Sequence, residues 1–173
     1  MMNIKNNAWK VWVIVLVLLV LPGMAGRVMA EDWTDPTRLP QGSGIYRLTT
    51  DVTMSDWYIN GDSISLELNG HTLTITGETG IAVQMDGMLQ ITDAKGGGII
   101  RFTGSGALKV TKGILNLDSG TIEGNIHLTP IGFQSSSVYA RLSGGTIRGS
   151  VYFEQGQSYS GNDWNAKIGR AHV

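Results

Sequence analysis

Cysteine does not occur anywhere in the 173-residue sequence. Its absence excludes a disulfide framework, a thiolate metal site, a cysteine nucleophile and a bacterial lipoprotein anchor. A chain without cross-links has to be stabilised by buried apolar side chains and by its backbone hydrogen bonds.

Basic residues are also few in the central part of the chain. Setting aside residues 1–30 and 167–173 leaves 8 Lys and Arg against 14 Asp and Glu, a net charge of −6. Phosphate recognition needs clustered Lys and Arg, so neither nucleic acid nor an anionic membrane surface is an expected partner. The same balance makes a strongly anionic polysaccharide a less obvious ligand.

Motifs that carry catalysis are missing as well. The sequence holds no G-x-S-x-G, no H-E-x-x-H, no phosphate loop and no calcium-binding glycine-aspartate repeat. A glycosidase or a calcium-dependent lyase needs carboxylates that converge, whereas only Glu67 and Glu123 fall squarely on expected strand faces. We therefore expect no catalytic residue, metal or cofactor here. The remaining central acids fall mostly in expected turns, among them Asp51, Asp56, Asp62, Glu78, Asp86, Asp93 and Asp118.

The N-terminal segment, residues 1–30, is typical of a secretory signal peptide. Two lysines precede an apolar run over residues 11–21, Pro22 and Gly23 end it, and Val28-Met29-Ala30 has the small residues of a cleavage site. The run is shorter than the ~20 residues that span a bilayer. We expect a secreted or cell-surface protein that begins at Glu31 and has no membrane span after cleavage. An uncleaved anchor helix is the alternative.

We expect the last residues to have a different origin. Residues 167–173 (KIGRAHV) can be read back, codon by codon, into the start of a widely used sequencing-library adapter, and they continue none of the strand pattern. We expect residues 161–173 to be a non-native or unstructured tail, and the natural chain to be truncated at or before Ala166.

The central region nearly repeats itself. Residues 117–128 (LDSGTIEGNIHL) return as residues 142–153 (LSGGTIRGSVYF), at an offset of 25, with apolar positions and glycines kept in phase. Residues 87–91 similarly match residues 113–117 at an offset of 26. A period of this length with short alternating strands between glycine turns indicates a β-solenoid. We predict an all-β, right-handed, three-sided parallel β-helix over residues 44–160, with 23–26 residues per coil.

Several stretches of the sequence resemble a known group of proteins. Residues 44–53 (GIYRLTTDVT) with residues 66–74 (LELNGHTLT) resemble the opening of parallel β-helix repeat proteins secreted by bacteria. Residues 119–122 and 144–147 resemble the glycine corners of the same proteins. The resemblance implies a pectin-lyase-like architecture in an adhesin-like, non-catalytic branch, and it transfers no catalytic residue. The alternative is the N-terminal part of a polysaccharide lyase or glycoside hydrolase whose catalytic residues lie beyond Ala166.

Two segments depart from the repeat. Residues 31–43 show no helical or strand periodicity and are expected to cap the solenoid, with Trp33 and Leu39 covering its core. An exposed, sugar-stacking Trp33 is the alternative. Residues 129–137 are expected to form an irregular third side or a short excursion from the coil.

Aligning the repeats predicts which side chains share a column. One inward column is expected to hold Leu66, Leu89, Leu115 and Ala140, and a second to hold Leu68, Ile91, Leu117 and Leu142. The outward column between them is a candidate glycan-binding face, and a solvated polar face is the alternative. Its members are Glu67, Gln90, Asn116 and Arg141.

The repeat also predicts two further pairs of outward-facing residues, and the two members of each pair are expected in neighbouring coils. Glu123 and Arg148 are expected to form an ion pair between neighbouring strands. His127 and Tyr152 could form a proton relay or a sugar platform, but no carboxylate shares their register. The sequence thus predicts a non-catalytic extracellular scaffold that binds glycans of a host or cell-wall surface weakly, and that self-associates through an uncapped end.

Overall fold

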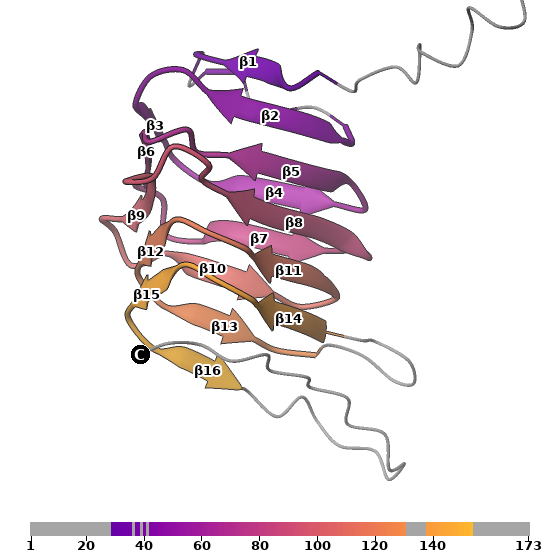
Figure 1. Cartoon of the computed structure of the whole chain (residues 1–173). Coiled ribbons are helices and arrows are strands. Elements are labelled where there is room, and N and C mark those ends of the chain that lie inside the picture. Colours follow the sequence, from indigo (N-terminus) through magenta and orange to yellow (C-terminus); the bar gives the residue numbers. More distant parts are fainter. Residues whose placement is uncertain (1–28, 36, 39, 41, 131–137, 154–173) are drawn as a thin grey trace, which may run out of the picture.

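The computed structural model describes residues 29–35, 37–38, 40, 42–130 and 138–153. These residues contain no helix, and their strands stack into three parallel sheets, a β-solenoid of about four turns (Figure 1). The predicted three-sided parallel β-helix is confirmed. Among the described residues there is accordingly no helix long and apolar enough to cross a membrane.

Each coil contributes one strand to each sheet. Sheet A holds β1 (Glu31–Trp33), β2 (Gly44–Leu48), β5 (Ser63–Glu67), β8 (Gly87–Thr92), β11 (Gly113–Leu117) and β14 (Val138–Leu142). Sheet B holds β3 (Val52–Met54), β6 (Thr72–Ile75), β9 (Ile99–Phe102), β12 (Thr121–Glu123) and β15 (Thr146–Arg148). Sheet C holds β4 (Trp57–Asn60), β7 (Gly80–Gln84), β10 (Ala107–Val110), β13 (Ile126–Leu128) and β16 (Val151–Phe153).

The alternation of apolar residues places every second side chain inside the coil. Leu115, Ile122 and Ile126, for example, come from the three sheets and are at most 1% exposed. The corner between β5 and β6 needs positive φ at two consecutive residues, and Asn69 (51°) and Gly70 (79°) tolerate that conformation. The chain turns at this corner from sheet A into sheet B.

The register between β5 and β8 corrects the predicted columns. Leu89 lies opposite Ile64, not Leu66, so β8 is shifted by two positions along β5 from the predicted alignment. Leu66 consequently pairs with Ile91, and Leu68 lies beyond the end of β5. The later coils agree with the prediction, because Leu115 lies opposite both Leu89 and Ala140.

The N-terminal end begins with a strand that the sequence pattern did not predict. β1 pairs with β2 in parallel and adds an outermost strand to sheet A. Its last residue, Trp33, is 5% exposed, and its ring lies 5.4 Å from the ring of Trp57. Trp33 therefore covers the core, and the alternative of an exposed sugar-stacking ring is wrong.

Several other expectations concern residues outside the described part of the chain. They are the signal peptide up to residue 28, the covering role of Leu39, the excursion over residues 131–137 and the tail of residues 161–173.

Candidate functional site

The predicted glycan-binding face of sheet A is only partly assembled. Gln90, Asn116 and Arg141 lie side by side in one outward column, as predicted. The residue of β5 in that column is Ser65, because Glu67 pairs with Thr92 instead. A shift of two positions keeps Glu67 on the outer face but moves it to the end of the strand, so its assignment to this column is wrong.

The carboxylate of Glu67 accepts hydrogen bonds at the corner where the chain leaves sheet A. Its Oε1 accepts hydrogen bonds from the backbone N–H groups of Asn69 (3.0 Å) and Ala94 (2.8 Å). Its Oε2 accepts one from the hydroxyl of Thr92 at 2.7 Å. Since Ala94 and Thr92 belong to the next coil, this carboxylate links two consecutive coils.

Gln90 is also engaged within the solenoid. Its side-chain N–H donates to Oδ2 of Asp118 at 2.6 Å, while the Ser143 hydroxyl donates to Oδ1 of the same carboxylate. These hydrogen bonds, from Ser143 first and Gln90 second, hold the pKa of Asp118 below its ordinary value, and the charge of Arg141 acts in the same direction. The polar groups of this face thus serve largely to join one coil to the next.

On the outer face of sheet B, one acid lies between two arginines. Glu123 is in register with Arg101 of the preceding coil and Arg148 of the following coil. Each of its two oxygens accepts a 2.7 Å hydrogen bond from one guanidinium. These bonds, Arg101 first, lower the pKa of Glu123. The expected pair with Arg148 is confirmed, and Arg101 extends it to a ladder of three charges.

The outer face of sheet C carries a different chemistry. His127 and Tyr152 lie in register, with ring centroids 4.8 Å apart and ring planes at 31°. The same outward column continues through Lys109 and Ala82 to Tyr58. We call these five residues the sheet C column. Tyr58 and Tyr152, at its two ends, are 50% and 44% exposed.

None of the five described strands of sheet C contains an acidic residue. The hydroxyl of Tyr58 donates to the hydroxyl oxygen of Thr79 at 3.2 Å, which holds the ring toward the second coil. A parallel ladder of Asn60 and Gln84 joined by a 2.7 Å hydrogen bond borders the sheet C column on one side. The face therefore combines exposed aromatic rings, amides and one lysine.

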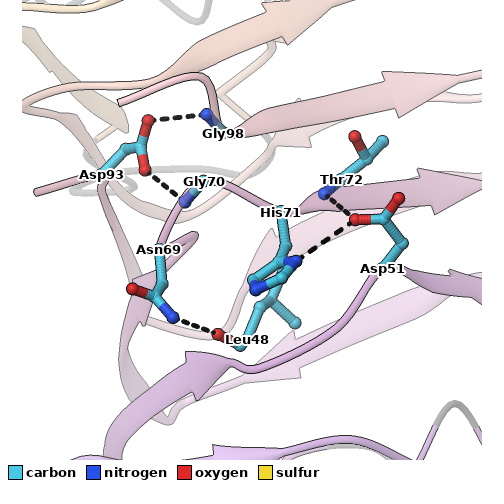
Figure 2. A network of polar contacts seen from close by, with 8 residues as sticks. All are labelled: Leu48, Asp51, Asn69, Gly70, His71, Thr72, Asp93 and Gly98. Atoms are coloured by element: carbon cyan, nitrogen blue, oxygen red, sulfur yellow. Dashed lines mark hydrogen bonds and ion pairs between the residues drawn. The ribbon is translucent and has the colours of Figure 1, made fainter. Parts of the chain in front are cut away.

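The corner between sheets A and B holds the one buried charged residue of the described chain, Asp93. Figure 2 shows how its two oxygens accept the backbone N–H groups of Gly70 (2.8 Å) and Gly98 (2.7 Å). Asp51 lies in the corner between β2 and β3, and its Oδ1 accepts the N–H of Thr72 at 2.9 Å and lies 3.4 Å from Nδ1 of His71 (Figure 2). The turn acids here therefore bind backbone of their own coil or of an adjacent coil.

The described residues contain no group of three or more His, Asp or Glu placed to hold a metal ion. A shallow hollow of about 100 Å³ lies beside sheet A and is lined by Asp86, Gly113, Ile114 and Tyr139. None of the six residues predicted to bind ligand lines it.

No protein family, curated protein or solved structure matches this chain closely enough to establish kinship.

Sequence reasoning found two members of the sheet C column, His127 and Tyr152, and missed Tyr58 and Lys109. Lys109 stands between Leu108 and Val110, so strand alternation alone could have placed it outward. The sequence did not reveal that Lys109 lies beside His127. Fewer residues separate β10 from β13 than separate β13 from β16, so aligning the repeats does not bring Lys109 and His127 into register.

Proposed function

We propose that this chain is a non-catalytic, rigid β-helical scaffold that binds glycans on the outer face of sheet C. The observation that carries the proposal is the sheet C column, in which a stacked His127–Tyr152 pair, Lys109 and Tyr58 lie on one outer face. This moves the candidate site away from the face of Gln90, whose amide is bonded within the solenoid.

The chemistry of the column suits a sugar chain. The C–H faces of pyranose rings pack against aromatic rings, and sugar hydroxyls bond to amide, imidazole and ammonium groups. Successive strands of a sheet lie ~4.8 Å apart, so the five positions form a straight row. A linear glycan could contact Tyr152 and Tyr58 together only if it lay along this row.

The proposal includes the setting expected from the sequence. The leader-like residues 1–30 support export, and the repeat motifs support a place among bacterial, pectin-lyase-like, adhesin-like proteins at the cell surface. A stiff solenoid suits that role because its stacked coils hold a binding face at a fixed distance from an attachment point.

The experiment is a binding titration of the chain against soluble plant and host polysaccharides. Tyr152→Ala should weaken binding about 3- to 10-fold, the effect of losing one aromatic contact. The matched control is Tyr139→Ala. Tyr139 lies in the same coil and is similarly exposed (41%), but it projects from sheet A. It should leave binding unchanged.

Two results would contradict the proposal. Equal losses for the Tyr152 and Tyr139 variants, or no glycan binding by the unaltered chain, would remove the sheet C column as a site. Release of reducing or unsaturated ends from the same polysaccharides would refute the non-catalytic role and favour a lyase or hydrolase.

A further inference from the structure

The dipeptide Asn-Gly occurs twice in the sequence, at residues 60–61 and at residues 69–70. In such a dipeptide the backbone nitrogen of the glycine can attack the side-chain amide carbon of the asparagine, because glycine has no side chain to hinder the approach. Gly61 and Gly70 both have a φ of 79°. A difference in reactivity between the two dipeptides therefore has to come from their surroundings.

The reaction replaces the asparagine amide with a carboxylate. A bond forms between the glycine nitrogen and Cγ of the asparagine, the bond from Cγ to Nδ2 breaks, and the proton lost by the glycine nitrogen is returned through solvent to the departing ammonia. Water then adds to either carbonyl carbon of the resulting succinimide ring and opens it to aspartate or isoaspartate. The reaction consumes one water, releases one ammonia and involves no oxidation. It requires a glycine N–H that can lose its proton and an amide that can be attacked.

The dipeptide Asn69-Gly70 is restrained at both reacting groups. Nδ2 of Asn69, the leaving group, donates to the backbone carbonyl of Leu48 in the preceding coil at 3.0 Å (Figure 2). The N–H of Gly70, which carries the attacking nitrogen, donates to the carboxylate of Asp93 in the following coil at 2.8 Å. A negative charge beside this N–H disfavours removal of its proton. Asn69 should therefore react slowly in the folded chain.

The dipeptide Asn60-Gly61 lies in a more permissive environment. Both residues are exposed, and a Cβ built at Gly61 would meet only the carbonyl oxygen of Met85, at 3.3 Å. The N–H of Gly61 donates to a neutral acceptor, the backbone carbonyl of Gln84, at 3.1 Å. The side-chain N–H of Gln84 donates to Oδ1 of Asn60 at 2.7 Å. Negative charge develops on this oxygen when the nitrogen adds to Cγ, so a donor aimed at it stabilises the intermediate.

We propose that Asn60-Gly61 is a site of spontaneous deamidation, whereas Asn69-Gly70 is protected by the carboxylate of Asp93. Either product at residue 60 places a carboxylate on β4, in a sheet whose described strands contain no acid. Isoaspartate would also lengthen the backbone where β4 ends. The proposal does not rest on glycan binding by sheet C.

The test is peptide mass mapping of the full chain after incubation at mildly alkaline pH, with isoaspartate labelled by its methyltransferase. In the folded chain, Asn60 should be modified at least about tenfold faster than Asn69, the factor that corresponds to one hydrogen bond to a charged group. In concentrated urea the two rates should become similar, because the contacts that distinguish the sites are lost.

A pair of variants tests the role of Asp93. Asp93→Ala removes the acceptor of the Gly70 N–H, so the rate at Asn69 should rise toward the rate at Asn60 in the same sample. The control is Asp56→Ala, which removes a carboxylate that also accepts two backbone N–H groups. It should leave the ratio of the two rates unchanged.

Equal rates at the two sites in the folded chain, or an Asn60 that stays unmodified there, would overturn the proposal. A difference that persists in urea would attribute the selectivity to neighbouring residues in the sequence and would contradict protection by the fold. An equal rise at Asn69 in both variants would contradict the role of Asp93, because general loosening of the solenoid would explain it.

Discussion

Oδ1 of Asp93 accepts a 2.8 Å hydrogen bond from the backbone N–H of Gly70, which lies in the preceding coil of the solenoid. The other oxygen accepts the N–H of Gly98 at 2.7 Å, so one carboxylate closes its own turn and fastens it to its neighbour. Asp51, Asp56 and Glu67 likewise accept backbone N–H groups of the following coil. Such bonds account for several of the acids that the sequence places in turns.

Removing the Asp93 carboxylate should destabilise the fold. Asp93→Ala leaves two N–H groups without an acceptor at a site that is 7% exposed, and we expect a loss of about 3 kcal/mol in the free energy of unfolding. Urea denaturation measures it. The control, Asp86→Asn, breaks an exposed 3.0 Å pair with Lys112 and should cost less than about 1 kcal/mol. Equal losses would show that the corner bonds contribute no more than a surface pair.

Two glycines have nearly the same φ but different surroundings, so replacing each with Ala distinguishes the cost of a steric clash from the cost of backbone strain. A Cβ at Gly80 (φ 88°) would lie 2.2 Å from the carbonyl oxygen of Ala107, whereas a Cβ at Gly97 (φ 87°) would meet nothing within 4 Å. Gly97→Ala should cost about 1–2 kcal/mol, the penalty of a left-handed residue. Gly80→Ala should cost roughly 4 kcal/mol or more, because β7 and β10 must separate. Denaturant midpoints that fall equally would contradict this interpretation.

Acid should weaken the ladders of Asp118 and Glu123. Both carboxyl groups have pKa values lowered from the ordinary 3.8 and 4.5, so their ionised forms favour the folded chain. Their contribution is complete above those ordinary values and is lost as the pH falls through the lower pKa values of the folded state. Asp118→Asn and Glu123→Gln should therefore destabilise the chain near neutral pH.

The measurement is the free energy of unfolding of each variant relative to the unaltered chain, between about pH 6 and about pH 2. The difference should shrink as the pH falls, since acid removes from the unaltered chain the same charge that the substitution removes. A difference that stays constant over this range would mean that ionisation of these groups does not stabilise the fold.

Much of the local structure followed from the sequence. Alternation in Leu115-Asn116-Leu117 correctly placed the leucines inside and the asparagine outside, because strand side chains alternate with a period of two. The repeat of residues 117–128 as residues 142–153 correctly paired Glu123 with Arg148 and His127 with Tyr152. The strand at Glu31–Trp33 was not recognisable, because so short a segment cannot display a period.

The sequence by itself determined the three-sheet solenoid and, from β2 onward, the face on which strand side chains lie, since these depend on local alternation and on corner residues such as Asn69 and Gly70 that accept positive φ. Only the tertiary structure decided which coil positions meet. Leu66 and Ile64 both point inward, so apolar pattern alone cannot choose which of them lies opposite Leu89. The choice depends on how the intervening turns pack, and it determined that Ser65, rather than Glu67, lies beside Gln90.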